Sequence, residues 1–199
     1  MNKTVSINLG GIFFHIEEDA FTRLEGYLDS INRHFANEEG ADEILEDIET
    51  GLAEIFREKM AGGQIVTMKE VNDAVSVMGT PEDFGAEPLF EEDKNYASSK
   101  ANSEYNYKTG KRLYSNPDDK VIGGVCAGIG HYFGIDRIWI RIVFLFAFFV
   151  WGIGFIPYII LWIVIPKAKT TAEKLEMKGE AVNVDNIKKT VEDKFNDLK

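Results

Sequence analysis

The sequence predicts an α+β soluble amino-terminal domain with the element order ββααβα, followed by an all-α membrane module. Residues 5–16 alternate apolar and polar side chains around the pair Gly10–Gly11, as the two strands of a β-hairpin do. Apolar residues then recur at helical spacing through most of residues 21–78. Residues 142–165 carry no charge over 24 positions, a length that is typical of a membrane segment.

These patterns divide the chain into four regions. The α+β domain takes residues 1–85, and residues 86–110 form a polar linker without periodicity. The membrane module takes residues 111–167, and residues 168–199 form an amphipathic helical tail.

Helix signals follow the predicted hairpin. Asp19 is placed to cap a first helix, and residues 41–60 carry an apolar stripe that predicts a second. A short strand at Val66 leads to a third helix, which begins after Thr67 as its cap and ends at Gly79.

Acidic charge is concentrated in the amino-terminal half of the chain. Most of the 33 Asp and Glu residues lie within residues 1–110, and the formal net charge of the chain is −11. We therefore expect no nucleic-acid partner, because phosphate binding needs a basic face. The carboxylates between Glu38 and Glu49 lack the turn glycine and the ligand spacing of a calcium loop, so we expect a solvated helix face and no metal or other cofactor.

The sequence shows no pattern of an enzyme. His15, His34 and His131 are scattered, without a metalloprotease or nucleophile-elbow motif beside them. Cys126 is the single cysteine and lies among small residues, which indicates a packing role. We therefore expect a non-enzymatic protein, with no catalytic, cofactor-binding or metal-binding residue.

Small residues and a proline interrupt the uncharged run near its middle. The run is long enough for one helix to cross about 30 Å of hydrocarbon, with a kink at Pro157. Alternatively, the interruption is the turn of a re-entrant helical hairpin, which basic residues on both sides of the run would suit. Both arrangements stay open. The residues expected at the membrane–water interface are Trp139, Arg141, Trp162 and Lys167.

A glycine-rich segment precedes the run and is predicted to form a helix that Gly134 ends, with Asp136 capping the next helix. Glycine weakens a helix interior by roughly 1 kcal/mol per site, so several of them indicate close approach to another backbone. Either this helix only packs on the apolar run, or its glycine face docks another membrane protein. The residues expected in helix packing or partner docking are Gly124, Gly128, Gly130, Gly152, Gly154 and Pro157.

The same region resembles a known family. Its sequence, RLYSNPDDKVIGGVCAGIGHYFGIDRIWIRIVFLFAFF followed by YIILWIVIP, resembles the PspC domain of bacterial phage-shock proteins over about residues 111–167. The resemblance implies a protein of the bacterial cytoplasmic membrane that senses or relays envelope stress through partners and not through catalysis. It also implies that the additional acidic domain lies in the cytoplasm.

The carboxyl-terminal tail carries a second amphipathic pattern. Ile187, Val191 and Phe195 recur at helical spacing, and Asp185 is placed as a cap. So short a helix is marginal alone, so we expect it to dock on a partner, on the amino-terminal domain or on its own copy in an oligomer.

Two functions follow from these expectations. The first is a membrane adaptor or stress sensor whose partners are the lipid bilayer and other proteins, among them another membrane protein or a second copy of the chain. The alternative is a membrane-tethered regulator whose acidic domain sequesters a transcription factor.

Overall fold

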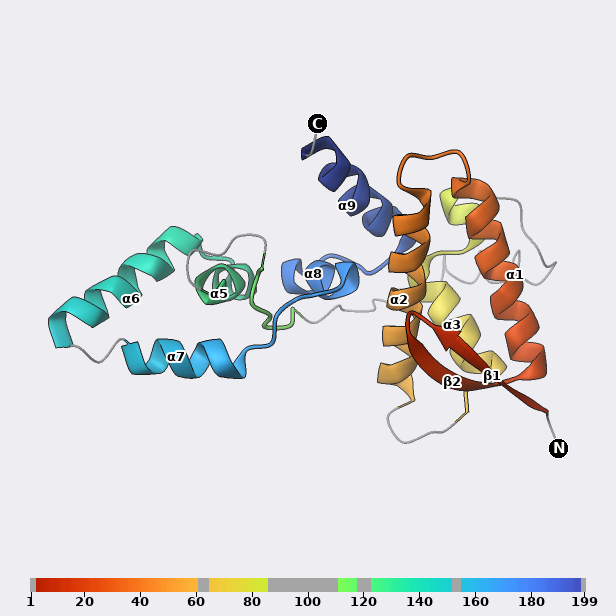
Figure 1. Ribbon diagram of the computed structural model, residues 1–199, viewed down its shortest axis with the longest axis horizontal. Coiled ribbons are helices and arrows are strands. Elements are labelled where there is room, and N and C mark those ends of the chain that lie inside the picture. Colours follow the sequence, from red (N-terminus) through yellow and green to blue (C-terminus); the bar gives the residue numbers. More distant parts are fainter. Residues whose placement is uncertain (1–2, 61–64, 86–110, 118–122, 152–154, 198–199) are drawn as a thin grey trace, which may run out of the picture. The chain divides into compact units, whose positions relative to one another are not determined.

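The computed structural model describes residues 3–60, 65–85, 111–117, 123–151 and 155–197. The chain forms two compact units, whose elements are labelled in Figure 1. The first unit combines Met1–Tyr107 with Val182–Lys199, and the second unit is Lys108–Ala181. The described structure is mostly helical, with a small sheet of two strands.

The first unit begins with a hairpin at the predicted place. β1 (Thr4–Leu9) and β2 (Ile12–Glu17) pair antiparallel and in full register. Gly10 and Gly11 have φ angles of 54° and 80°. Residues with a side chain rarely adopt these angles, so two glycines make the tight turn at little cost.

The predicted third strand is absent from the described part of the first unit. Val66 makes one isolated bridge instead: its N–H donates to the carbonyl of His15 at 2.7 Å, and its carbonyl accepts from the N–H of Glu17 at 3.0 Å. The order ββααβα is therefore wrong. The physical reason is length, because Thr67 already caps the next helix and leaves Val66 as a single paired residue.

Three helices complete the amino-terminal part of this unit. α1 (Glu18–Phe35), α2 (Ala41–Lys59) and α3 (Met68–Met78) pack against one another, and a short 3-10 helix, η1 (Pro81–Phe84), follows. Figure 1 shows the hairpin across one end of these helices.

The helix ends match the expected caps at α3 but not at α1. Thr67 and Glu70 form a reciprocal capping box at the start of α3, and Gly79 follows its last residue. α1 begins two residues earlier than expected, after Glu17, so Asp19 lies in the first turn instead of capping it. A carboxylate there still favours the helix, because the first turn carries unpaired N–H groups.

The core of the first unit is formed by one face of each element. Phe14 and Phe56 meet edge to face with ring centroids 5.8 Å apart, and the buried hydroxyl of Tyr27 donates to the carbonyl of Gly79 at 2.8 Å. Burial raises the pKa of that hydroxyl, so it remains a donor. The largest side chains buried in this core are Ile16, Leu24, Tyr27, Ile31, Phe35, Ile44, Ile48, Leu52, Phe56 and Met78.

The second unit is built around α5 (Val125–Phe133), which contacts α6 (Arg137–Trp151), α7 (Phe155–Val164) and α8 (Thr171–Lys178). The backbone of Ser115, in the segment before α5, pairs with the segment that follows α7. Its N–H donates to the carbonyl of Pro166 at 2.8 Å, and its carbonyl accepts from the N–H of Ala168 at 3.0 Å.

The predicted all-α membrane module is contradicted, both as a kinked span and as a helical hairpin. Within the residues that the structure describes, no helix has the length and apolar character needed to cross a membrane. The uncharged run is divided between α6, with 15 residues, and α7, with 10 residues. At about 1.5 Å per residue these helices measure about 22 Å and about 15 Å, against about 30 Å of hydrocarbon.

The position of Pro157 explains part of this division. It is the third residue of α7, where a helix N–H has no partner within the helix, so proline belongs to a helix start and not to a bend within one long helix. Gly152 and Gly154 lie outside the described residues.

Candidate functional site

Two parts of the molecule are candidate functional sites. The first is the outer surface of α6 and α7. α6 has a partly buried stripe that includes Ile140 and Phe144, and the ring of Phe144 meets Tyr158 of α7 edge to face at 5.4 Å. Most of the remaining described side chains of these helices are large, apolar and exposed. They are Ile138, Trp139, Ile142, Val143, Leu145, Phe146, Phe149, Ile156, Ile160, Trp162, Ile163 and Val164.

Such exposure is unusual for a chain in water. A helix that is apolar on all sides normally lies within a protein core or against lipid, and large exposed apolar patches mark binding surfaces. The exposed fractions here reach 76% for Phe149 and 77% for Ile163. The surface is therefore suited to a non-aqueous environment or an apolar partner.

The residues predicted for the membrane–water interface lie on or beside this surface. Trp139 near the start of α6 is 65% exposed, and Trp162 near the end of α7 is 47% exposed. Arg141 is partly buried, and Lys167 is exposed where its backbone bridges to Ser115.

The predicted glycine face is occupied by the chain itself. A methyl group added at Gly128 would overlap the carbonyl oxygen of Tyr114, and one added at Gly124 would overlap the carbonyl of Asn116. Gly124 lies just before α5, with a φ of 72°, and not inside a helix as expected. A Cβ at Gly130 would lie 2.8 Å from the carbonyl oxygen of Ile135. The close backbone approach therefore involves segments of the same unit.

The other predicted landmarks of this unit are at helix ends. Gly134 follows the last residue of α5 in a left-handed conformation, as expected. The carboxylate of Asp136 accepts from the N–H of Ile138 at 2.9 Å at the start of α6. Pro157 is exposed in the first turn of α7.

Burial shifts the pKa values of several groups in the second unit, among them Cys126 and His131. Burial raises the pKa of the Cys126 thiol, although the Arg141 guanidinium opposes the shift, so the thiol is not activated as a nucleophile. Burial lowers the pKa of His131, and the nearby Lys178 and Lys111 lower it further.

The comparison with known families decides what this unit is. The family model of the PspC domain matches residues 111–168. The chain carries a PspC domain. PspC is a non-enzymatic stress-response domain family whose members are generally membrane-associated. The PspC domain of this chain includes the glycine contacts, the Ser115 hydrogen bonds and the whole exposed surface of α6 and α7. No curated protein and no solved structure matches the chain.

The second candidate site is the contact of the last helix, α9 (Val184–Asp197), with α2 in the first unit. Val182, Ile187 and Val191 are buried there, with exposed fractions of at most 4%. Gly51 of α2 lies beside them: a Cβ at this position would lie 3.5 Å from Val182 and 3.7 Å from Ile187, which is ordinary van der Waals contact, and 2.6 Å from the side chain of Met78 in α3. Of the three docking sites that the sequence left open for this tail, the structure thus shows the amino-terminal domain.

Charge complementarity fixes the register of this contact. The ammonium of Lys188 lies 2.7 Å from the carboxylate of Glu38, and that of Lys194 lies 2.7 Å from Glu43 and 4.0 Å from Asp47. Part of the acidic run is therefore paired and not a freely solvated face. The lysines of the tail, Lys188 and Lys194, are visible in the sequence, but local spacing does not indicate which carboxylates they pair with.

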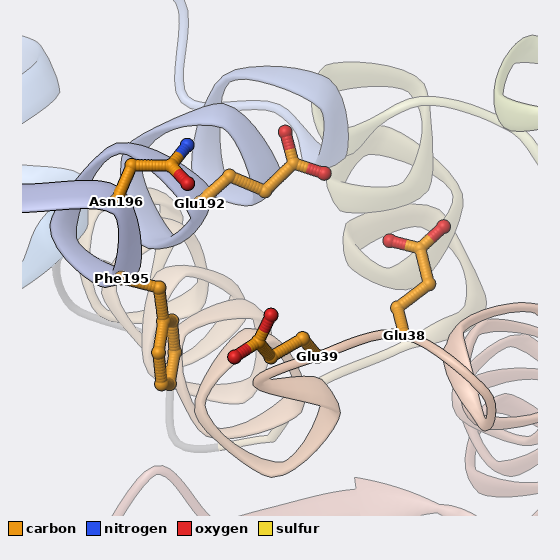
Figure 2. A pocket seen from close by; sticks show the side chains of 5 residues that line it. All are labelled: Glu38, Glu39, Glu192, Phe195 and Asn196. Atoms are coloured by element: carbon orange, nitrogen blue, oxygen red, sulfur yellow. The ribbon is translucent and has the colours of Figure 1, made fainter. Parts of the chain in front are cut away.

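The carboxyl-terminal part of α9 borders a hollow of about 350 Å³, with an aromatic ring at its edge. Figure 2 shows the carboxylates of Glu38, Glu39 and Glu192 around this space, beside Phe195 and Asn196. The contact between α9 and α2 is therefore open to solvent at the carboxyl-terminal end of α9. Asn183 and not Asp185 caps the helix, because its side-chain oxygen accepts from the N–H of Asn186 at 2.9 Å.

Proposed function

We propose that this chain is a non-enzymatic regulator of the envelope-stress response, associated with the cytoplasmic membrane through α6 and α7. The PspC domain at residues 111–168 supports a role in the stress response, because PspC is a stress-response domain family. The membrane contact and the role as sensor or adaptor are our proposal. The first unit would then carry the contacts with protein partners.

The observation that carries the proposal is the exposed apolar surface of the two helices. Burying a Phe or Leu side chain contributes about 1.5–3 kcal/mol relative to leaving it in water, so a dozen such side chains favour a bilayer interface strongly. Trp139 and Trp162 suit this interface, because their rings combine an apolar body with a polar N–H. Two short helices lying at the interface agree with lengths that do not cross the hydrocarbon.

Vesicle flotation of the full chain tests the membrane contact. We expect the wild type to float with vesicles of phosphatidylglycerol and phosphatidylethanolamine, and Phe146→Glu/Phe149→Glu to lose at least about tenfold in partitioning, because two charges enter the apolar surface. The side chains of both residues are at least 69% exposed, so the change leaves the described core intact.

A matched control lies in the first unit. Phe13 of β2 is 78% exposed, so Phe13→Glu makes the same chemical change outside the proposed contact. It should float as the wild type does. Equal flotation of all three proteins, or no flotation of the wild type, would refute the proposed contact.

A further inference from the structure

We propose that the α2 surface beneath α9 is a self-association site, at which α9 of a second copy of this chain replaces the chain's own. This inference deepens the proposed function and rests on it, because contact between copies would be one of the protein contacts through which the regulator acts. It concerns the first unit, so it is tested separately from the membrane contact.

The fit between α9 and α2 is specific on both sides. Ile187 and Val191 are fully buried, with Ile187 beside Gly51 on an apolar strip of α2, and Lys188 and Lys194 face the carboxylates of Glu38 and Glu43. A second copy presents the same helix and the same strip. Exchange of α9 between copies would therefore reproduce every contact of the closed chain without any new complementarity.

The course of the chain makes such an exchange feasible. α9 belongs to the first unit, but the whole second unit, Lys108–Ala181, separates it in sequence from Met1–Tyr107. Lys188 and Glu38 are 150 positions apart. A long connection lowers the effective concentration of the chain's own α9 at α2. The α9 of a neighbouring copy can therefore compete for the same strip, and the share of exchanged copies rises with the local concentration of the protein. Gathering PspC domains on a bilayer raises that concentration.

The ionic part of the contact is weak enough to open. The side chains of the two close ion pairs are 29–40% exposed, and the hollow of Figure 2 admits water beside them. Exposed ion pairs contribute only about 0.2–1 kcal/mol each and weaken with salt. Because α1, α2 and α3 form a core of their own, release of α9 would leave that core in place, at the cost of exposing Ile187 and Val191.

Two complementary full-length variants give a decisive test. Glu38→Lys/Glu43→Lys reverses the charge of the strip, and Lys188→Glu/Lys194→Glu reverses the charge of α9. Each variant alone repels its own α9. Mixed in a mild detergent that covers α6 and α7, they form two matched contacts only between copies, so we expect a 1:1 dimer at least about tenfold more abundant than for either variant alone.

The chain with all four substitutions is the matched control, since it restores both pairs within one copy and should return to the oligomeric state of the wild type. Light scattering after size exclusion measures the mass of each sample. Mixed variants that stay monomeric while the fourfold variant is folded would overturn the proposal. So would variants that associate equally well alone, because another surface would then hold the copies together.

Hydrogen exchange of the wild-type chain keeps the proposal testable if a variant does not fold. We expect the amides of α9 to exchange faster than those of α2, and faster still at high salt. Equal exchange of the two helices at every salt concentration would mean that α9 does not leave its strip, and the proposal would fail. Because this experiment needs no vesicles, failure of the membrane contact would not affect it.

Discussion

The two units of this chain differ in how many of their large apolar side chains are exposed. In the described part of the first unit, the large apolar side chains with substantial exposure are Val5, Phe13 and Ile65, and the core consists of interdigitated side chains. In the second unit, most large side chains of α6 and α7 face outward, while the interior combines Ile165, Leu175 and Met177 with small residues and close backbone contacts.

This difference shows which forces hold each unit. The first unit depends on side-chain burial, as an amphipathic fold does in water. The second unit adds close backbone contact to the burial of Leu175 and Met177. Ser115 bonds to the backbone of Pro166 and Ala168, and Gly128 lies against Tyr114. Most large side chains of α6 and α7 remain exposed and available to the surroundings of this unit.

The largest effect is expected where backbones touch in the second unit. Gly128→Leu places a side chain where the Tyr114 carbonyl lies, so we expect this unit to lose about 3 kcal/mol of unfolding free energy or more. All three tryptophans, Trp139, Trp151 and Trp162, lie in the second unit, so urea unfolding followed by tryptophan fluorescence measures this unit alone.

Gly134→Asn is the control for that variant. Gly134 has no neighbouring atom within 4 Å of an added Cβ, and asparagine tolerates its left-handed φ of 70° better than most residues. We expect this variant to lower the unfolding free energy of the second unit by about 1 kcal/mol. An equal loss in both variants would mean that backbone conformation, and not close contact, limits the stability of the second unit.

The side-chain core of the first unit should respond to a cavity. Ile48 of α2 is fully buried, so Ile48→Ala is expected to cost about 2–5 kcal/mol, and Ile48→Val about 1 kcal/mol. Far-UV circular dichroism in urea follows both units, while tryptophan fluorescence follows the second. If the fluorescence transition moved as much as the dichroism transition, the two units would unfold together, and the inference of two independent cores would be wrong.

The smallest effect is expected from His131. Its pKa is lowered in the folded chain, first by burial and then by Lys178 and Lys111, although Glu180 opposes the shift. The unfolded chain therefore binds the proton more readily, and this contribution to stability is present above about pH 6.5 and is lost as the pH falls. His131→Gln should flatten the dependence of the tryptophan-detected midpoint between pH 7.5 and 5.5. An unchanged slope would exclude His131 as its source.

Local patterns predicted the elements whose causes are local. The alternation around Gly10–Gly11 predicted the hairpin, and Thr67 and Gly79 predicted the ends of α3, because turns and caps depend on residues a few positions apart. The prediction of a third strand was wrong, because only Val66 precedes the cap at Thr67 and pairs with β2. Whether a short apolar segment forms a strand depends on the neighbouring strand, which local spacing does not give.

Two further features could not be predicted from spacing. The hydropathy of residues 142–165 left open whether the uncharged run is one kinked helix or two shorter halves. The structure shows two helices, of which one ends at Trp151 and the other begins at Phe155, and each is too short to cross a membrane. The docking of Lys188 and Lys194 on α2 depends on the return of a distant segment, for which neither partner has a local signal.

The separation of α9 from α2 in sequence also sets an order in time. Synthesis proceeds from the amino terminus, and domains fold as units as they appear. The PspC domain ends at residue 168 and is therefore complete before α9 has been made. Until then Gly51 and the strip around it lack the helix that covers them. The first unit is thus completed only after the PspC domain, although most of it is synthesised before that domain.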